Sequence, residues 1–188
     1  MLRNALLATA VAAIAVAASP AAAKLADGAK APDFSAPAYL AGNAFTYKLA
    51  DSLKKGPVVL YFFPSAYTSG CNVEAHLFSE AVDEFKANGA TVIGVTSGKL
   101  ERLAEFSKDT ESCGGKFPVA ADPGAAIAKR YDAPMSMNGM SMPGLSGRVS
   151  YVIAPDGTVI HAYDNLNPND HVDQTLGAVK AWKAGKRK

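Results

Sequence analysis

Cys71 stands in the part of this 188-residue sequence where residue types and spacing could most directly do chemistry. The stretch from Phe62 to His76 reads FFPSAYTSGCNVEAH, in which strand-forming residues give way to a short polar loop and then to a helical pattern. A cysteine at a helix N-terminus faces unpaired N–H groups and the positive end of the helix dipole, and both favour the reactive thiolate. Because Thr68 occupies the position three residues earlier, no thiol there can close a short disulfide. We therefore expect Cys71 to stay free for an external substrate.

Four further side chains are expected to complete this site. Pro64 stiffens the loop and leaves no competing N–H, and the hydroxyl of Thr68 can point toward the sulfur or toward an oxygen atom bound beside it. Glu74 lies one turn after Cys71, where a carboxylate beside a thiolate requires a cation. Arg148 begins the apolar run RVSYVIA and is the natural candidate for that cation, because the start of such a strand can lie beside the helix that Cys71 opens.

The N-terminal residues predict a secretory signal peptide, which we place at residues 1–23. Arg3 supplies the positive charge, residues 5–18 are small and apolar throughout, and residues 21–23 form an A-x-A cleavage site. This apolar run is shorter than the roughly 20 residues that a membrane-spanning helix needs. Residues 24–188 would then form a single exported domain, which we place in the bacterial periplasm.

Composition argues against two classes of partner. The chain has 19 Lys and Arg against 17 Asp and Glu, and its basic C-terminal end, KAGKRK, is short. A nucleic-acid-binding surface would need a basic stripe with interleaved aromatic residues, which the sequence lacks. After the N-terminal segment, no apolar run is long enough to cross a membrane. We therefore expect neither a nucleic-acid partner nor membrane insertion.

The order of expected elements predicts an α/β domain. Continuous apolar runs typical of buried strands alternate with amphipathic segments typical of helices, and the turn Pro155-Asp156-Gly157 joins the last two strands. Such an order implies a mixed central sheet with helices on both faces, which is the thioredoxin-like fold. The expected strands are 58–63, 91–96, 118–122, 149–154 and 158–164, and the expected helices are 71–86, 100–112, 123–131 and 170–182.

Two of these helices bear directly on the site. In the helix over 71–86, apolar residues recur every four positions and predict its buried face, namely Val73, Leu77, Ala81 and Phe85. The helix over 100–112 would place Cys113 at its end. A Gly-Gly pair follows Cys113 and would make a local rearrangement of the chain easier.

The residues around Cys71 resemble those of the peroxiredoxins. Pro64, Thr68 and Cys71 match the family motif P-x-x-x-T-x-x-C, and Arg148 matches the arginine that these proteins place before a late strand. The stretches FFPSAYTSGCNVEAHLF and GRVSYVIAPDG are similar to the Q-type group, also called bacterioferritin comigratory proteins. The resemblance covers roughly residues 28–182, nearly the whole expected domain.

This resemblance implies reduction of hydrogen peroxide or of an organic hydroperoxide. Cys71 would attack the terminal peroxide oxygen and become a sulfenic acid, while water or an alcohol leaves. Thr68, Arg148 and the backbone N–H groups near Cys71 would hold the peroxide oxygens and stabilise the charge that develops as the O–O bond breaks. Pro64 would shield the thiolate from water. A thioredoxin-like or other thiol reductant would then restore the reduced protein.

The sequence departs from the Q-type pattern C-T-x-E-A-C, because it reads C-N-V-E-A-H. His76 replaces the resolving cysteine of many members, and we interpret it either as a polar helix residue or as a group that tunes the site. The resemblance leaves Cys113 as the candidate resolving cysteine. Three hypotheses stay open, namely a cycling Cys71–Cys113 disulfide, a static structural bridge, and an unpaired Cys113 with an external thiol as the resolver. A cycling disulfide would require local unwinding, since Cα atoms more than about 7 Å apart cannot be bridged.

The methionine segment MSMNGMSM, residues 135–142, is a second unusual feature. Thioethers are soft ligands that suit Cu(I), and the alternative is a loop whose methionines cover the rim of the site or absorb oxidant. His161 and His171 lack metal-ligand spacing, and we interpret them as a strand residue and a polar residue at a helix start. We therefore assign no metal site and no cofactor.

Three classes of function are compatible with these features. A peroxiredoxin is favoured, because the constellation of proline, threonine, cysteine and arginine is far more specific than a lone T-x-x-C. An exported thiol–disulfide oxidoreductase would share the fold but normally needs the absent C-x-x-C. A copper-binding thioredoxin-fold protein would rest on the methionine segment. We expect a monomer or weak dimer whose partners are a peroxide and a thiol reductant.

Overall fold

The computed structural model describes residues 24–137 and 140–186, so the signal peptide predicted at residues 1–23 lies outside the described residues. The strands are β1 (Ser35–Leu40), β2 (Asn43–Lys48), β3 (Val58–Ser65), β4 (Thr91–Gly98), β5 (Val119–Ala121), β6 (Pro134–Met137), β7 (Met140–Ser146), β8 (Val149–Ile153) and β9 (Val159–Asp164). The helices are α1 (Leu49–Leu53), α2 (Ser69–Ala87), α3 (Leu103–Lys108), α4 (Ala126–Arg130) and α5 (His171–Lys186), with 3₁₀ turns at Leu100–Arg102 and Pro123–Ala125.

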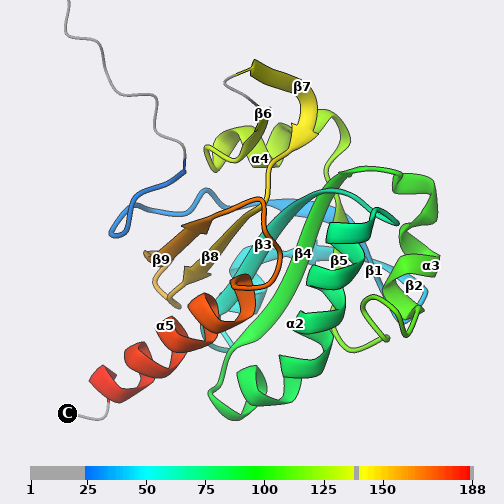
Figure 1. Ribbon diagram of the computed structural model, residues 1–188. Coiled ribbons are helices and arrows are strands. Elements are labelled where there is room, and N and C mark those ends of the chain that lie inside the picture. The colour runs from blue at the N-terminus through cyan, green and yellow to red at the C-terminus, as the bar shows by residue number, and fades with distance from the viewer. Residues whose placement is uncertain (1–23, 138–139, 187–188) are drawn as a thin grey trace, which may run out of the picture.

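A seven-stranded mixed sheet forms the centre of the domain, in the order β2-β1-β5-β4-β3-β8-β9. The three central strands β5, β4 and β3 are parallel, whereas β1, β8 and β9 pair antiparallel with their neighbours. Figure 1 shows α2 and α5 across one face of the sheet, and α1 and α4 contribute buried residues to the core on the other face. The predicted α/β domain with a mixed sheet and helices on both faces is confirmed.

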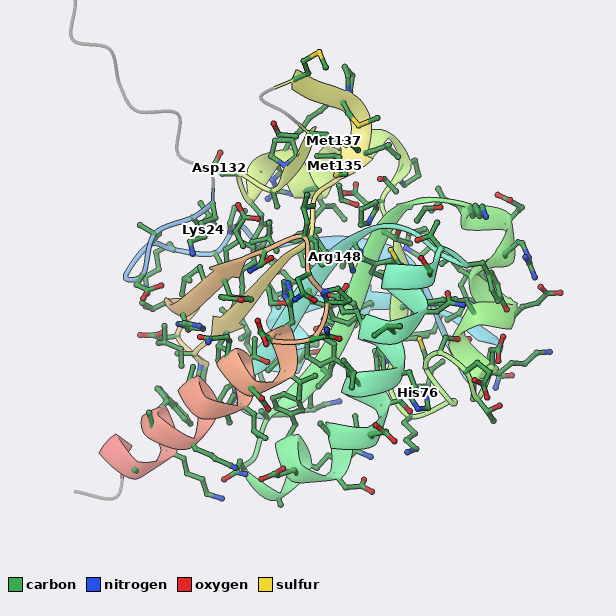
Figure 2. All side chains as sticks on the ribbon, in the orientation of Figure 1. Lys24, His76, Asp132, Met135, Met137 and Arg148 are labelled. Carbon is green, nitrogen blue, oxygen red and sulfur yellow. The ribbon has the colours of Figure 1, made fainter. Side chains whose placement is uncertain are left out.

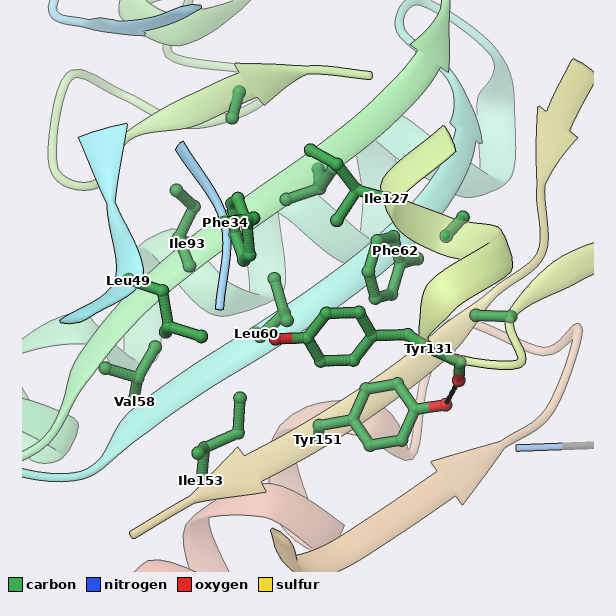
Figure 3. Packing of buried hydrophobic residues seen from close by; sticks show 14 of the residues in the cluster. Phe34, Leu49, Val58, Leu60, Phe62, Ile93, Ile127, Tyr131, Tyr151 and Ile153 are labelled. Atoms are coloured by element: carbon green, nitrogen blue, oxygen red, sulfur yellow. Dashed lines mark hydrogen bonds between the residues drawn. The ribbon is translucent and has the colours of Figure 1, made fainter. Parts of the chain in front are cut away.

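Two cores lie on opposite faces of β3. Figure 3 shows the first of them, in which the hydroxyl of Tyr151 donates a hydrogen bond to the backbone oxygen of Tyr131 at 2.5 Å. The second core lies beneath α2 and α5. Alternate residues of β3 enter the two cores, Val58, Leu60 and Phe62 in the first and Val59, Tyr61 and Phe63 in the second. This double burial explains why the strand is a continuous apolar run in the sequence.

The first turn of α2 contains Cys71, as the sequence predicts, because the helix begins at Ser69. Of the four residues predicted on the buried face of this helix, only Phe85 is fully buried; Ala81 is partly buried and packs against the core, and Val73 is 43% exposed. The residues that α2 buries are Cys71, Glu74, Ala75, Phe78, Ser79, Val82 and Phe85. These positions alternate steps of three and four, which follows the 3.6-residue period, whereas a constant step of four drifts around the helix. The true orientation turns Glu74 toward the sheet.

The helix predicted over 100–112 is shorter than expected. A 3₁₀ turn leads into α3, which ends at Lys108, and Asp109 adopts extended dihedral angles. The side-chain oxygen of Asp109 accepts the N–H of Glu111 at 3.0 Å, a local hydrogen bond that competes with continuation of the helix. Cys113 therefore lies in a turn beyond the helix rather than at its end, which corrects the prediction.

The methionine segment forms an antiparallel hairpin of β6 and β7 rather than a loop. Met137 pairs with Met140, and Ser136 pairs with Ser141. Met135 is buried, whereas the side chains of Met137 and Met140 are exposed. Residues 138–139 lie outside the described part of the chain. Figure 1 shows this hairpin beside α4, beyond one end of the central sheet.

The other predicted elements are present with shifted ends, while β1, β2 and α1 were not predicted. β3 continues through Pro64 and pairs Ser65 with Gly98 of β4, so the proline does not end the strand as expected. The last helix continues to Lys186. In the ranges that the structure covers, no helix combines the length and the apolar character that a membrane-spanning segment needs.

Candidate active site

Cys71 lies at the third position of α2 and is almost completely buried. Thr68 is the N-cap residue, and its carbonyl oxygen accepts the N–H of Asn72 at 2.9 Å, which closes the first turn. Cys71 is 1% exposed and belongs to the core beneath α2. The unpaired N–H groups of this helix end favour negative charge, so the position suits a thiolate.

Arg148 brings a positive charge to the sulfur from the residue directly before β8. Its Nη2 lies 3.6 Å from Cys71 Sγ, and its Nη1 donates a hydrogen bond to Glu74 Oε2. Nε donates to the backbone oxygen of Leu166 at 2.9 Å, which fixes the plane of the guanidinium. A Cβ at Gly70 would lie 3.1 Å from Nη2, so this glycine permits the close approach. Figure 2 shows Arg148 between β8 and the N-terminal end of α2.

The charge on Arg148 is secured by its anionic neighbours. Burial disfavours the charged guanidinium, yet the charges of Glu74 and Cys71, together with the hydrogen bonds to them, raise the pKa of Arg148 above its ordinary value. A single cation therefore contacts both a sulfur and a carboxyl group in a nearly dry site.

Glu74 is a fully buried carboxyl group one turn after Cys71. Burial raises the pKa of Glu74 to about 8, although the charge of Arg148 and its hydrogen bond act in the opposite direction. Oε2 accepts the hydrogen bond from Arg148, and Oε1 lies 3.5 Å from His171 Nδ1. The expected contact between Arg148 and Glu74 is thus present, as a hydrogen bond from the guanidinium to a carboxyl group that burial favours in its protonated form.

His171 belongs to this site, although no sequence pattern placed it there. The residue begins α5, as expected, but its side chain is fully buried. Nδ1 lies 2.7 Å from Ser150 Oγ, and Nε2 lies 2.9 Å from the backbone oxygen of Asn165. Burial lowers the pKa of His171 to about 4; the hydrogen bond to Asn165 opposes this shift, and the charge of Arg148 adds to it. The one available signal was Ser150, a polar residue inside an apolar strand, which needs a buried partner.

The loop between β3 and α2 contains Pro64 and Thr68. The hydroxyl of Thr68 donates to the backbone oxygen of Ser65 at 3.1 Å. Between them, Tyr67 has a left-handed backbone with φ of 55°, and the guanidinium of Arg102 lies 3.8 Å above its ring. A non-glycine residue in this region is strained, and such strain is concentrated at functional loops. The roles of Pro64 and Thr68 toward a bound peroxide stay predictions.

Cys113 is a second free thiol, fully buried in the same core as Cys71. Burial raises the pKa of Cys113 well above its ordinary value, and the charge of Asp109 raises it further. Burial raises the pKa of Tyr61 well above its ordinary value, and negative charge on Cys113, Glu74 or Cys71 raises it further. Tyr61 therefore lies within electrostatic reach of both cysteines. A buried, protonated Cys113 can react only after the chain around it opens.

His76 connects α2 to the turn that carries Cys113. Its Nδ1 lies 3.2 Å from the backbone oxygen of Thr110, and its Nε2 lies 3.6 Å from Glu80 Oε1. The side chain is 44% exposed, which agrees with the interpretation of a partly exposed helix residue. No cluster of three or more His, Cys, Asp or Glu residues suited to a metal ion occurs in the described ranges.

The arrangement suits two-electron oxidation of one sulfur atom. Thr68 stands where a C-x-x-C motif would have its first cysteine, so Cys71 can react with an external oxygen atom without competition from an adjacent thiol. Arg148 can stabilise the thiolate and donate to an oxygen that gains negative charge. Such a site fits nucleophilic attack by sulfur on a peroxide.

Comparisons with known proteins agree with this chemistry. The sequence profile described as the AhpC/TSA family matches residues 28–162. The chloroplastic Peroxiredoxin Q of Sedum lineare is 32% identical over 131 residues, which cover 69% of this chain and 67% of that protein. Across the matching plant Peroxiredoxin Q proteins, the aligned part spans 54% to 67% of their length.

Two solved structures of related proteins show the same fold. Peroxidoxin BcpB from Mycobacterium tuberculosis superposes with a TM-score of 0.70 at 26% identity, covering 82% of this chain and 96% of that one. The bacterioferritin comigratory protein of Xanthomonas campestris superposes with a TM-score of 0.65 at 26% identity, covering 78% and 91%. The predicted thioredoxin-like fold and the resemblance to Q-type peroxiredoxins are confirmed, and the chain belongs to the AhpC/TSA family.

Proposed function

We propose that this protein is a thiol-dependent peroxidase that reduces hydrogen peroxide or organic hydroperoxides through Cys71. The observation that carries the proposal is the 3.6 Å contact between Arg148 Nη2 and Cys71 Sγ in the first turn of α2. Membership of the AhpC/TSA family supports it. The reported structure of the Xanthomonas protein concerns alkyl peroxide reduction, which supports organic hydroperoxides as substrates.

In the first step, the Cys71 thiolate attacks the terminal oxygen of the peroxide. An S–O bond forms and the O–O bond breaks, so the sulfur is oxidised by two electrons to a sulfenic acid, and the leaving oxygen takes up a proton from solvent to give water or an alcohol. The leaving oxygen carries negative charge in the transition state, and Arg148, Thr68 and backbone N–H groups stabilise it. Arg148 is held beside the sulfur before the reaction, whereas the hydroxyl of Thr68 must leave the backbone oxygen of Ser65 to donate to the peroxide.

In the second step, Cys113 attacks the Cys71 sulfenic acid, releases water and forms a disulfide. Both cysteines are buried, so the first turn of α2 and the turn around Cys113 must open. Gly114 and Gly115 have φ values of 58° and 70°, a left-handed conformation in which glycine is unstrained, and they give this turn its freedom to rearrange. A thioredoxin-like or other thiol reductant then reduces the disulfide.

Neither alternative function has comparable support. A thiol–disulfide oxidoreductase normally uses C-x-x-C, and Thr68 stands at that position. A copper-binding role would rest on the β6–β7 hairpin, where Met137 and Met140 are exposed opposite each other. The family match and the Arg148–Cys71 contact both favour the peroxidase instead.

We also propose that the protein is exported to the bacterial periplasm and acts as a monomer or weak dimer. The sequence of residues 1–23 supports export, and the presence of both cysteines in one core supports a cycle within one chain. Cell fractionation should recover a mature chain that begins near Lys24 from the periplasm, and light scattering should give its mass in solution. An uncleaved chain in the cytoplasmic fraction would contradict export.

A peroxide-consumption assay with a dithiol reductant tests the peroxidase. The wild-type protein should consume hydrogen peroxide or an alkyl hydroperoxide catalytically, and Cys71→Ser should not, although circular dichroism should show its fold intact. Turnover by Cys71→Ser at more than a few per cent of the wild-type rate would overturn the assignment.

A further inference from the structure

The methionine segment, residues 135–142, is an unusual feature of the sequence that the two peroxidase steps leave without a role. Apart from Met1, it contains every methionine of the chain. In the structure these residues lie on the β6–β7 hairpin, which places Met135 and Met137 apart from Arg148 (Figure 2). The chemistry at Cys71 therefore does not explain why the thioethers are concentrated in one hairpin.

The strand register places three of these side chains on one face of the hairpin. Met137 pairs directly with Met140, and Ser136 pairs with Ser141. Side chains alternate between the two faces along a strand, and β7 continues to Ser146, so Met142 lies on the same face as Met140. The paired serines point to the opposite face. We call the surface formed by Met137, Met140 and Met142 the thioether face.

The thioether face contributes little to the packing of the fold. Met140 is 69% exposed, which makes it the most exposed large apolar side chain in the described ranges, and Met137 and Met142 are 45% and 37% exposed. Met135, by contrast, is buried. A methionine stabilises a fold by filling space in a core, and the three residues of the thioether face are largely in solvent. Their sulfur atoms are thus accessible to a ligand.

The spacing of the thioether face suits one small ion. Directly paired residues of an antiparallel hairpin have Cβ atoms about 4.5–5.5 Å apart, and diagonal partners are about 7–8 Å apart. Methionine is unbranched and has three rotatable side-chain bonds, so its sulfur can turn in many directions. The three sulfur atoms can therefore meet at one point above the hairpin through rotamer changes alone, without any movement of the backbone.

The chemistry of the donors selects the ion. Thioethers are soft, uncharged ligands that suit Cu(I), whereas Mg²⁺ and Ca²⁺ require oxygen ligands. No cluster of three or more His, Cys, Asp or Glu residues suited to a metal ion occurs in the part of the chain that the structure describes, so the thioether face offers a different type of ligand set. A thioether also carries no acidic proton that a metal must displace.

We propose that Met137, Met140 and Met142 form a binding site for one Cu(I) ion on the β6–β7 hairpin. One ligand comes from β6 and two come from β7, so the bound ion links the two strands. The site is separate from Cys71, and the reaction at Cys71 does not require the ion. The proposal is therefore independent of the peroxidase function.

NMR of the methionine methyl groups tests the site directly, with Ag(I) as a probe that resembles Cu(I) but does not change its oxidation state. Each methyl signal is assigned by its loss in the corresponding Met→Leu variant. We expect the signals of Met137, Met140 and Met142 to shift together and to saturate at one equivalent of Ag(I), while the buried Met135 responds little. Signals that do not move, or that move independently and only in large excess of Ag(I), would overturn the proposal.

The two thiols of the protein also bind soft metals, so this titration uses the variant Cys71→Ser/Cys113→Ala. Should that variant fail to fold, the wild-type protein still decides. Its two thiols can take the first two equivalents of Ag(I), and the three methyl signals should then shift together with the third. Methyl signals that stay unchanged beyond the third equivalent would contradict the site.

Competition with a coloured Cu(I) chelator in the absence of oxygen measures the affinity of the same cysteine-free variant. Met140→Leu keeps the apolar shape but removes a ligand. Its affinity should fall at least about tenfold, because even residues that only support a ligand contribute about that much. Ser141→Ala, on the opposite face, should bind as before. An affinity that Met140→Leu leaves unchanged would contradict the proposal.

The pH dependence of Cu(I) binding separates thioethers from other ligands. Since thioethers do not titrate, the affinity should be the same at about pH 5.5 and about pH 7.5. An affinity that falls at the lower pH would show that histidine side chains hold the ion, because these must lose a proton to bind a metal. That result would overturn the assignment of the site to the thioether face.

Discussion

Arg148 Nη2 lies 3.6 Å from Cys71 Sγ, although 77 residues separate them in the sequence. The contact follows from strand pairing. β3 and β8 are antiparallel neighbours whose register pairs Phe62 with Val149, so the residue before β8 meets the end of β3. The loop after β3 leads directly into α2, which brings the sulfur to the same place.

Replacing Arg148 with alanine should slow the first oxidation of Cys71 roughly ten- to a hundredfold. The reason is the loss of a charge-assisted contact worth about 1.5–3 kcal/mol in the transition state. Stopped-flow mixing with peroxide measures the rate. Arg130→Ala serves as the control, because Arg130 lies on α4 and donates to the backbone oxygen of Asp33. An unchanged rate in Arg148→Ala would show that the arginine has no part in the chemistry.

Removing the sulfur of Cys113 should separate the two steps of the cycle. Cys113→Ala should reduce a first equivalent of peroxide at nearly the wild-type rate, because Cys71 and Arg148 are untouched. Steady turnover with thioredoxin should collapse, and Cys71 should accumulate as sulfinic acid as the peroxide concentration rises. Mass spectrometry of Cys71 follows the product. Normal turnover without excess sulfinic acid would assign resolution to an external thiol.

A thermal melt of the same variant tests the structural-bridge hypothesis. The fold described here carries both cysteines as free thiols. We therefore expect Cys113→Ala to lose only the stability that a small buried cavity costs, whereas loss of a structural disulfide typically costs about 2–5 kcal/mol. A large loss before any peroxide is added would favour the bridge.

Tyr61→Phe should stabilise the protein by about 1 kcal/mol. The hydroxyl of Tyr61 is buried and has no hydrogen-bond partner in the described ranges, so its removal relieves a desolvation cost. Tyr131→Phe is the matched control, because that hydroxyl donates to the backbone oxygen of Pro32 at 2.6 Å and its loss should destabilise by about the same amount. Urea unfolding measures both. A destabilised Tyr61→Phe protein would mean that the hydroxyl has a stabilising partner, such as a cysteine sulfur.

The wild-type protein should lose stability between about pH 6.5 and pH 8 relative to Glu74→Gln, by roughly 2 kcal/mol. The pKa of Glu74 is raised from 4.5 in the unfolded chain to about 8, so the stability it contributes is full at low pH and is lost as the pH rises through about 8. The lowered pKa of His171 affects the free energy of unfolding only below about pH 6.5, where stability falls as the pH falls. The window from about pH 6.5 to pH 8 therefore avoids the titration of His171. Urea unfolding at both pH values measures the difference. Parallel curves for the two proteins would show that Glu74 is ionised in the fold, and exposed Glu80→Gln controls for surface charge.

The sequence could propose a site because its signals lie within single elements and match a family motif. The spacing of Pro64, Thr68 and Cys71 is fixed by one loop and one helix start, and the apolar run of β3 reports burial on both faces. Arg148 was proposed because it precedes a recognisable strand and matches the arginine of the peroxiredoxins, and the structure pairs that strand with β3. The loop, the helix start and the strand need only local backbone geometry, whereas the position of Arg148 depends on the pairing of the two strands.

Two features within single helices were predicted wrongly. The buried face of α2 was missed because a regular step of four looks like a stripe although the helical period is 3.6. The end of α3 was missed because Asp109 offers the backbone a local hydrogen bond that competes with the helix.

The protonation of the site depends on the three-dimensional arrangement. Glu74, Ser150 and His171 come from α2, β8 and α5, and nothing in their sequence spacing brings them together. The charge states of Glu74 and His171 are set by burial and by neighbours within a few ångströms, quantities that exist only once the helices have covered the sheet. The sequence therefore predicted Cys71 as the nucleophile and Arg148 as its cation, and only the folded arrangement brought the buried side chains of Glu74 and His171 together beside them.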